Sequence, residues 1–228
     1  MVTLISGVSR GIGKALFERS VSSSEYTIGL TRSSVLQVKQ QTSKSVIIGV
    51  NYDELEGLPE LIKSLTQGTG IDVLINNAGV LQKSELKEET LEGFLFHQKV
   101  NTWYPFYLFK VLEEENTLSK QAHIVNISSM GGVQGVNKYS GLFSYSASKS
   151  GLIALTEFLD VEFGGKGYSF NSLALGAVQT EMLKEAFPDY FSEVTSQKMA
   201  EFVFDFATRN GDLMSGKTIQ VQKSDPKG

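Results

Sequence analysis

Short runs of apolar residues recur along the chain and are separated by longer stretches with helical periodicity. The short runs are rich in β-branched residues, which favour strands. Seven are predicted strands: Val2–Ser6, Tyr26–Thr31, Ser45–Val50, Ile71–Asn76, Ala122–Ser128, Tyr168–Ala174 and Lys217–Val221. Apolar spacing between them predicts helices near residues 11–22, 53–67, 88–118, 143–164 and 195–209. Residues 33–42 fit either a helix or a loop.

Strands that alternate with helices predict a parallel sheet covered on both faces. The runs 73–75 and 123–127 are apolar almost throughout, as expected of strands that are buried on both sides. No internal repeat, low-complexity tract or linker interrupts this pattern. The sequence therefore predicts an α/β fold with one doubly wound Rossmann domain over residues 1–228.

Composition narrows the class of protein. The 228 residues are 41% apolar and 20% charged, which is ordinary for a globular domain. A net charge of −4 argues against nucleic acid or an anionic membrane as the main partner, and no apolar run approaches the ~20 residues of a membrane span. With no cysteine and two isolated histidines, His97 and His123, we expect neither a disulfide nor a metal centre. The N-terminus lacks the basic region of a signal peptide, so we expect a cytoplasmic protein.

A glycine-rich turn directly follows the first predicted strand. Gly7, Gly11 and Gly13 have the spacing G-x-x-x-G-x-G, and a predicted helix begins within it. Gly7 suits a tight turn, Gly11 allows close approach of a pyrophosphate, and Gly13 allows the helix to pack on the strand. The helix N-terminus then faces the phosphates. The motif predicts a dinucleotide site; the alternative is an ordinary strand–loop–helix unit that happens to contain three glycines.

The end of the second predicted strand bears on the choice of cofactor. A protein that favours NAD commonly has an acidic residue there, which binds the ribose 2′-hydroxyl. This chain has Thr31-Arg32-Ser33 instead. Because guanidinium groups suit phosphate oxygens, Arg32 and Arg10 predict a clamp for a 2′-phosphate. NADP(H) is therefore favoured over NAD(H), unless both arginines are ordinary surface cations.

Candidate acid–base chemistry lies in the segment Tyr145–Lys149. If this segment is helical, the spacing of four places Tyr145 and Lys149 on one face. A phenol ionises near pH ~10, and a neighbouring ammonium lowers that pKa, which makes the tyrosine a usable general acid and base. Ser129 at a preceding strand end would hold a carbonyl oxygen, whereas Ser128 is expected to point the other way. Tyr139 lacks a lysine four residues later and is not a candidate.

Together these motifs resemble the short-chain dehydrogenase/reductase family in its compact form. The order of further segments supports the resemblance. Asn76–Gly79 resembles the family's Asn-Asn-Ala-Gly signature, and Asn101 matches the helix asparagine of the catalytic tetrad. Ile124–Ser129 resembles the strand that delivers the catalytic serine, with Ser129 the better candidate, and Phe170–Thr180 resembles the segment that closes over nicotinamide. The resemblance covers roughly residues 2–221.

The resemblance implies a mostly parallel seven-stranded sheet in the order 3-2-1-4-5-6-7. It implies a cofactor half over about residues 1–120 and a catalytic and substrate half over about residues 121–228. It also implies a homodimer or homotetramer, because residues 94–112 and 142–163 are more apolar than one buried face requires. A thick monomeric core is the alternative.

The resemblance further implies an NADP-dependent oxidoreductase that transfers a hydride between NADP(H) and a carbonyl/alcohol substrate. Tyr145 would be the general acid/base, Lys149 would lower its pKa and bind the nicotinamide ribose, and Ser129 would bind the substrate oxygen. Asn101 would anchor a water that relays protons to Lys149. The cofactor-binding residues would be Gly7, Ser9, Arg10, Gly11, Ile12, Gly13, Thr31, Arg32, Ser33, Asn51, Tyr52, Asn77, Ala78, Gly79, Tyr145, Lys149, Val178 and Thr180. Among them, Asn51 and Tyr52 would border the adenine.

The chain departs from the family pattern at several positions. Leu175 replaces a common proline, and Asn51-Tyr52 replaces the usual pair of an aspartate and an apolar residue. Ser129 and Tyr145 are 16 positions apart, a few more than is typical, so Gly131–Phe143 is expected to form a loop beside the substrate pocket.

The segment after Thr180 bears on the substrate. It contains Met182, Leu183, Phe187, Tyr190 and Phe191, which favour an aldehyde or ketone with an apolar body. The alternative is that these residues anchor the core or a subunit interface. Two rival functions remain: a regulatory or sensor protein that binds NADP(H) with little or no turnover, and an interaction protein that binds no cofactor. The complete tetrad and glycine set favour the enzyme.

Overall fold

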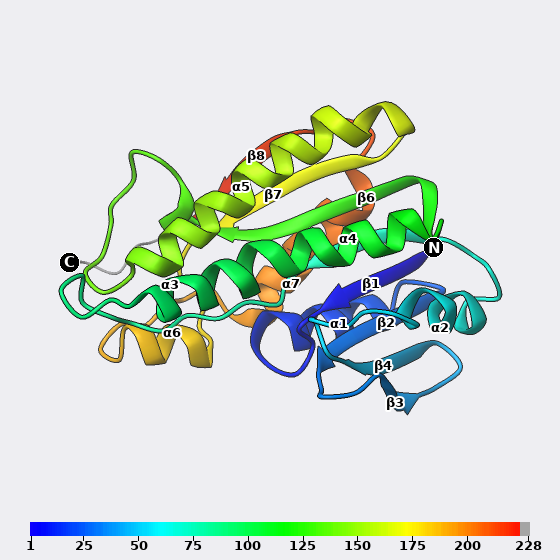
Figure 1. The fold of residues 1–228 in the computed structure, drawn as a ribbon, viewed down its shortest axis with the longest axis horizontal. Helices are drawn as coiled ribbons and strands as arrows, with labels where there is room; N and C mark the ends of the chain where they lie inside the picture. Colours follow the sequence, from blue (N-terminus) through cyan, green and yellow to red (C-terminus); the bar gives the residue numbers. More distant parts are fainter. Residues whose placement is uncertain (224–228) are drawn as a thin grey trace.

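The computed structural model describes residues 1–223, and their strands form one eight-stranded sheet in the order β3-β4-β2-β1-β5-β6-β7-β8 (Figure 1). Every neighbouring pair is parallel except β3 and β4. The predicted doubly wound α/β architecture is confirmed. The strands are β1 (Val2–Ser6), β2 (Tyr26–Arg32), β3 (Gln37–Gln41), β4 (Ser45–Val50), β5 (Ile71–Asn76), β6 (Leu118–Ser129), β7 (Ser169–Leu175) and β8 (Lys217–Val221).

The predicted count of seven strands was wrong by one, because β3 lies where a helix or loop was expected. Without β3, the observed order is the predicted one. All five residues of β3 are exposed, and Val38 is its one apolar residue. Its antiparallel pairing with β4 stabilises it, together with a turn in which Thr42 Oγ1 accepts hydrogen bonds from the N–H groups of Lys44 and Ser45. A polar strand at a sheet edge has no alternating pattern for sequence reasoning to detect.

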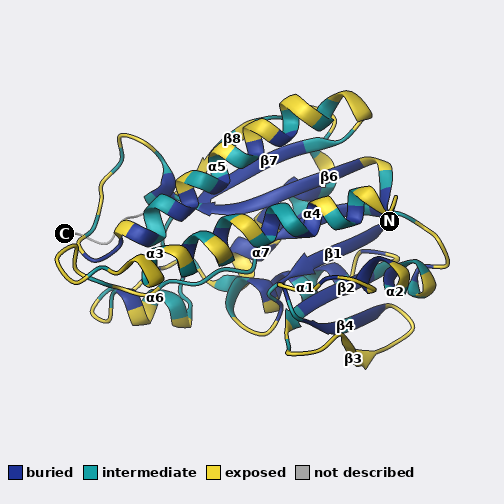
Figure 2. Cartoon of the chain, viewed as in Figure 1, coloured by how far each residue is buried: buried dark blue, intermediate teal, exposed yellow. Residues whose placement is uncertain are grey.

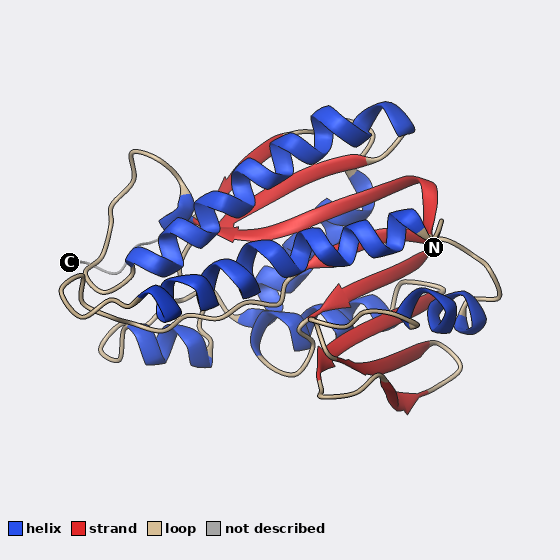
Figure 3. Ribbon diagram, viewed as in Figure 1, coloured by secondary structure: helices blue, strands red, loops and turns tan. Residues whose placement is uncertain are grey.

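Helices cover both faces of the sheet (Figure 3). On the face turned to the viewer lie α2 (Leu58–Leu65), α3 (Leu91–Gln98), α4 (Tyr104–Glu114) and α5 (Phe143–Phe163). On the far face lie α1 (Gly11–Val21) and α7 (Ser196–Arg209), and the short helix α6 (Glu181–Ala186) lies at one end. Burial follows these layers, with the central strands dark in Figure 2 and the outer helix faces exposed. The sheet therefore separates two apolar cores.

The predicted helix over residues 88–118 is interrupted. A π-helical turn, Lys99–Trp103, separates α3 from α4, and Tyr104 N–H donates to Lys99 O across it. Pro105 follows at the start of α4 and has no N–H to give to the carbonyl four residues earlier, which is that of Asn101. The π-helical turn thus contains Asn101, the predicted asparagine of the catalytic tetrad. Such turns are frequent at functional sites.

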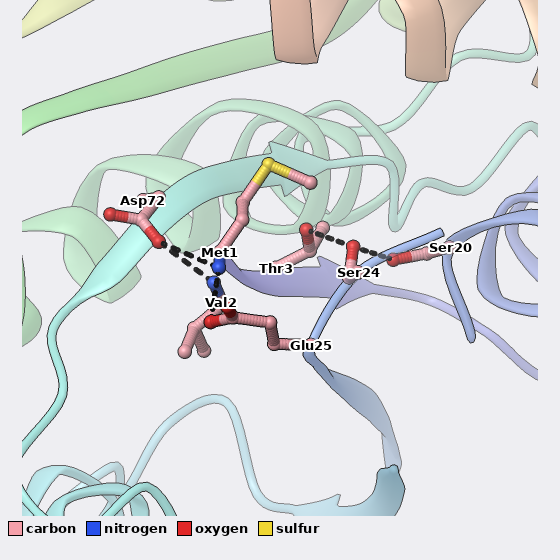
Figure 4. A network of polar contacts seen from close by, with 7 residues as sticks. All are labelled: Met1, Val2, Thr3, Ser20, Ser24, Glu25 and Asp72. Atoms are coloured by element: carbon pink, nitrogen blue, oxygen red, sulfur yellow. Dashed lines mark hydrogen bonds and ion pairs between the residues drawn. The ribbon is translucent and has the colours of Figure 1, made fainter. Parts of the chain in front are cut away.

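Polar contacts fix the amino end of β1 (Figure 4). The Met1 amine pairs with Glu25 at 2.6 Å, and Val2 N–H donates to Asp72 Oδ2 at 2.8 Å. In the same network, Thr3 and Ser24 share a buried hydrogen bond of 2.9 Å. These bonds tie β1 to both neighbouring strands, so that its carboxyl end, where the glycine-rich turn begins, is held in register.

Candidate active site

The glycine-rich turn has the backbone that its sequence predicts. Gly7 and Gly11 have φ values of +76° and +55°, a region that favours glycine. Gly7 N–H donates to Leu30 O at 2.8 Å, which joins the turn to β2. Helix α1 then begins at Gly11, and the side chain of its N-cap residue Arg10 makes no capping bond. The first N–H groups of α1 thus suit an anion.

Close packing behind the turn requires glycine at position 13. A Cβ there would lie well under 3.0 Å from Gly7 O and from Asn77 Nδ2. Asn77 itself donates from Nδ2 to Ser6 O at 3.1 Å and to Gly7 O at 3.2 Å. Asn77 therefore stabilises the junction of β1 and the turn, whatever else it contacts.

A cavity of about 590 Å³ lies at the carboxyl ends of the parallel strands. It is the place where doubly wound sheets bind their ligands. The glycine-rich turn lines one part of it and the acid–base candidates line another. The predicted residues on its wall are Gly7, Ser9, Arg10, Gly11, Ile12, Gly13, Thr31, Arg32, Tyr52, Asn77, Ala78, Gly79, Ser129, Tyr145, Lys149, Val178 and Thr180.

Three of the predicted catalytic and cofactor-binding residues are not part of this wall: Ser33, Asn51 and Asn101. Of the predicted substrate segment, Tyr190 and Phe191 are not part of it either. Ser33 Oγ accepts from Gln37 Nε2 at 2.9 Å and so holds the turn into β3. Asn51 Oδ1 accepts from Asp53 N–H at 3.2 Å. Both side chains therefore have a local structural role. Contact of Ser33 and Asn51 with a cofactor stays a prediction.

Tyr52 forms the wall near the end of β4. Its ring stacks on that of Tyr104, with centroids 5.2 Å apart and an angle of 21° between the planes. Burial raises the pKa of Tyr52. Tyr104 is held in turn by a hydrogen bond from its hydroxyl to Asp53, which also pairs with Lys99 at 2.7 Å. An aromatic surface anchored in this way suits a planar ring such as adenine.

The acid–base candidates meet at the ends of β6 and α5. Tyr145 and Lys149 lie one turn apart on α5, as their spacing predicts. Ser129, the last residue of β6, lies close to Tyr145: a Cβ on Gly131 would be 3.5 Å from Ser129 Oγ and 3.9 Å from Tyr145 Cε1. Ser128, by contrast, donates its hydroxyl to Lys149 O at 2.9 Å.

The pKa values differ from the sequence-based expectation. Burial raises the pKa of Tyr145, and hydrogen bonding with Ser129 opposes this only in part. Lys149 donates from Nζ to Ile127 O at 2.8 Å and is 5% exposed, and burial lowers its pKa to about 8. The expected lowering of the Tyr145 pKa is therefore not what the structure shows, because removal of the phenol from water dominates. The phenol stays protonated at neutral pH and can donate a proton.

Asn101 lies directly behind Lys149. Its side chain is fully buried: Nδ2 donates to Val80 O and to Ser148 Oγ, both at 2.9 Å, and Oδ1 accepts from Val80 N–H at 2.8 Å. A Cβ on Gly79 would be 3.2 Å from Asn101 Oδ1 and 3.4 Å from Lys149 Nζ. Asn101 thus fixes the loop segment after β5 that passes beside the lysine.

Helix α6 and the segment before it lie against the glycine-rich turn. The Thr180 hydroxyl caps α6 by accepting from Leu183 N–H, and its methyl carbon is 3.5 Å from the position of a Cβ on Gly11. Arg10 pairs with Glu185 of α6 at 3.6 Å, and both side chains are exposed. An exposed pair of this kind is weak, so Arg10 remains available to a ligand phosphate.

Sequence reasoning missed several residues of the site. Ser6 Oγ accepts the N–H groups of Asn77 and Ala78, both at 3.1 Å, and Ser148 binds Asn101. In the sequence, Ser6 has no feature that marks it as part of the site, and Ser148 is marked only by its position next to Lys149.

Tyr139, excluded as the catalytic tyrosine, still lines the cavity and packs edge-on against Phe187 at 5.1 Å.

Residues 1–190 match the model of the short chain dehydrogenase family. The chain belongs to this family. As a short chain dehydrogenase it is an oxidoreductase of the kind that binds a nicotinamide cofactor. Among the residues that the structure describes, no helix is long and apolar enough to cross a membrane.

Relatives of this short chain dehydrogenase include 3-oxoacyl-[acyl-carrier-protein] reductases. One from Synechocystis sp. is 29% identical over 189 residues, which cover 79% of this chain and 75% of the relative. One from Vibrio cholerae is 28% identical over 237 residues and covers 96% and 95%. These names indicate ketone reduction in the relatives.

Solved structures share the fold. A short-chain dehydrogenase/reductase from Serratia marcescens has a TM-score of 0.79 at 21% identity and covers 96% of this chain and 95% of its own. A short chain dehydrogenase from Burkholderia cenocepacia in complex with NADP has a TM-score of 0.78 at 19% identity, with the same coverage. At these identities the likeness extends to the fold alone.

Proposed function

We propose that this short chain dehydrogenase reduces an aldehyde or ketone with NADPH, with Tyr145 as the general acid. The observation that carries the proposal is the cavity, because its wall contains Ser129, Tyr145 and Lys149 together with the glycine-rich turn. The glycine-rich turn alone would indicate only a nucleotide-binding protein, and the three catalytic candidates alone would indicate only a reactive pocket. Because both line one cavity, they favour hydride and proton transfer to the same substrate.

The residues present fit a dinucleotide cofactor. The left-handed glycines Gly7 and Gly11 leave the backbone of the turn open to the phosphates at the N-terminus of α1, and the absent Cβ at Gly13 lets this helix pack against the turn. Arg32 and Arg10 would bind the 2′-phosphate, Tyr52 would border the adenine, and Val178 and Thr180 would contact the carboxamide. When bound, the cofactor supplies the hydride.

The protein's own groups would supply orientation and the proton. Ser129 Oγ would donate a hydrogen bond to the substrate carbonyl oxygen and hold it beside Tyr145. The phenol would then give its proton to that oxygen as negative charge develops there. The Lys149 ammonium would stabilise the phenolate that remains, and Asn101 would hold the segment around Gly79 and Val80 in place beside the lysine.

An apolar body is proposed for the substrate. The cavity beyond the tetrad has aliphatic and aromatic walls from the segment after Gly79, from α3, and from α6 with the residue that follows it. These residues are Leu81, Phe96, Met182, Leu183 and Phe187. Burial of an apolar substrate against them contributes roughly 25 cal/mol per Å².

The rate of carbonyl reduction should fall as the pH rises through about 8. The proposed mechanism requires Lys149 in its charged form, and burial lowers the pKa of Lys149 to about 8. Below that pH the ammonium is charged and Tyr145 is protonated, so kcat/KM should be level; above it, kcat/KM should decline with the fraction of charged lysine. The pH dependence of kcat/KM with NADPH measures this, because it reports groups of the free enzyme.

Lys149→Arg provides the control for the pH profile. A guanidinium stays charged throughout the range, so the variant should be slower but lack the decline near pH 8. A wild-type profile that stays level well above pH 8 would contradict the role given to Lys149.

Arg32→Ala should weaken NADPH binding roughly 10–100-fold and leave NADH binding unchanged. The factor follows from the ~1.5–3 kcal/mol of a hydrogen bond to a charged group. Fluorescence titration of wild type and variant with both cofactors measures it. Arg209→Ala, at an exposed position on α7, is the matched control and should alter neither affinity.

Equal affinity for NADPH and NADH in the wild type would contradict the preference for NADP(H). Tight NADPH binding with no reduction of any aldehyde or ketone would favour the regulatory or sensor function instead. Absence of binding to both cofactors would overturn the cofactor assignment.

A homodimer or homotetramer is part of the proposal. Exposed apolar side chains lie on α3, α5 and the π-helical turn, with Leu95 and Trp103 52% exposed and Phe158 65% exposed. Leu95, Trp103, Phe106 and Leu155 line a shallow groove there. Symmetric association would bury this surface. A cytoplasmic location is proposed because the sequence contains no cysteine.

A further inference from the structure

One cation on the cavity wall has no place in the proposed mechanism. Lys138 belongs to the segment between β6 and α5, which is longer than the family pattern. Its Nζ donates to the carbonyl oxygens of Gly131 and Val133, both at 2.6 Å. An ammonium has three N–H donors, and these two bonds fix its position while leaving one donor for a ligand.

The ammonium lies close to the reacting groups. Ser129 Oγ accepts from Gly131 N–H at 3.1 Å, and the carbonyl of the same glycine accepts from Lys138 Nζ. Because one residue spans at most ~3.6 Å, the path from Ser129 Oγ to Lys138 Nζ is shorter than roughly 10 Å. A small substrate held at Ser129 therefore reaches Lys138 with a chain of a few carbons.

Neighbouring contacts hold this segment in place. Tyr139, the next residue, packs against Phe187, and Lys83 donates to Ala186 O at 3.1 Å from the other side. Ser84 N–H donates to Gly141 O at 3.0 Å. The position of Lys138 is thus built into the wall between α6 and α5.

The other charges on the wall have uses elsewhere. Arg10, Arg32 and Glu181 lie at or near the glycine-rich turn, where Glu181 Oε2 is 3.8 Å from the position of a Cβ on Gly11. Lys149 belongs to the tetrad. Among the described residues that line the cavity, Lys138 is the one charge left for the substrate. The nearby carboxylates of Glu85 and Glu89 are not on the wall and accept from Ser140 and Ser144.

We infer that the substrate carries a carboxylate a few carbons from the reacting carbonyl, and that Lys138 binds it. The inference deepens the proposed function and rests on it. The carbonyl would lie at Ser129 and Tyr145, the carboxylate at the third N–H of Lys138, and the connecting carbons against the apolar wall. A charge-assisted bond of this kind gives specificity that an apolar wall lacks.

The test compares keto acids with their methyl esters at neutral pH. The probes are a γ-keto and a δ-keto carboxylate and the methyl ester of each, with NADPH as the cofactor. The wild type should reduce the acids with a kcat/KM about tenfold above that of the esters, the low end for a charged hydrogen bond that water reaches. Lys138→Met should abolish this preference by lowering kcat/KM for the acids alone.

Two further variants separate charge from structure. Lys138→Arg keeps a cation and should retain most of the preference, whereas Lys184→Met removes an exposed lysine on α6 that does not line the cavity and should change nothing. Equal rates for acids and esters in the wild type would overturn the inference. So would an equal loss for both in Lys138→Met, because that result means that Lys138 only supports the loop.

A failure of the proposed function gives a different result. If the wild type reduces neither acids nor esters, calorimetric titration of the γ-keto carboxylate and its ester, in the presence of NADP⁺, tests the site without turnover. Tighter binding of the acid that is lost in Lys138→Met would keep the carboxylate site and reject the reaction. Identical binding in wild type and variant would reject the site.

Discussion

Tyr145→Phe is expected to lower kcat/KM for carbonyl reduction by about 10²–10⁴-fold, the range that general acid–base catalysis contributes. The substitution removes the proton donor and keeps the ring that packs at the amino end of α5. Binding of NADPH should change little, because the glycine-rich turn and the arginines are untouched. Steady-state kinetics with NADPH, together with fluorescence titration of the cofactor, measure both effects.

Tyr139→Phe is the matched control for this prediction. Tyr139 lines the same cavity, and the substitution keeps the edge-on contact of its ring with Phe187. Its hydroxyl has no role in the proposed proton transfer, so reduction should continue at a rate close to that of the wild type. Comparable activity of Tyr145→Phe and Tyr139→Phe would remove Tyr145 from the mechanism.

The motifs that sequence reasoning located are those whose chemistry depends on local spacing. The turn from Gly7 to Gly13 is set by backbone needs that only glycine meets, so its place and shape follow from the sequence. The spacing of Tyr145 and Lys149 gives their common face as soon as the segment is helical. The order of the parallel strands came from the family resemblance and is confirmed.

Features that depend on partners distant in the sequence could not be predicted from it. Edge strand β3 is held by pairing with β4, and its exposed residues have no pattern of their own. The pKa of Tyr145 depends on how deeply α5 is buried, which spacing does not reveal. Nothing in the sequence singles out Lys138, and only the folded loop places it on the cavity wall.

The same distinction applies within the tetrad. Asn101 was placed by resemblance, yet the physical reason for its position is tertiary: a π-helical turn before Pro105 and three hydrogen bonds to Val80 and Ser148. Its side chain is used entirely in holding the loop segment at Gly79 and Val80 beside Lys149. Its contribution to proton transfer is therefore expected to act through the position of the lysine.

Gly13→Ala is expected to destabilise the fold by about 3 kcal/mol or more and to abolish measurable cofactor binding. The new methyl group would overlap Gly7 O and crowd Asn77 Nδ2, so either α1 must move away from β1 or the turn must change shape. Overpacking usually costs ~1–3 kcal/mol and occasionally more. Because Gly7 O is a backbone atom that cannot rotate away, we expect a cost of ~4 kcal/mol here. It outweighs the gain of ~1 kcal/mol that alanine usually brings to a helix. Since each kcal/mol shifts Tm by ~2–4 °C at this chain length, calorimetry should show a fall of roughly 6–12 °C.

Gly165→Ala separates this steric effect from the general replacement of a glycine. Gly165 is exposed, and a Cβ there would have no atom within 4 Å. This variant should therefore keep the wild-type Tm and bind NADPH normally. A Gly13→Ala protein with unchanged Tm and unchanged NADPH affinity would contradict the close approach of α1 to the turn. A lower Tm with normal affinity would show that the helix can move without disturbing the phosphate site, and the binding role of the turn would then rest on Gly7 and Gly11 alone.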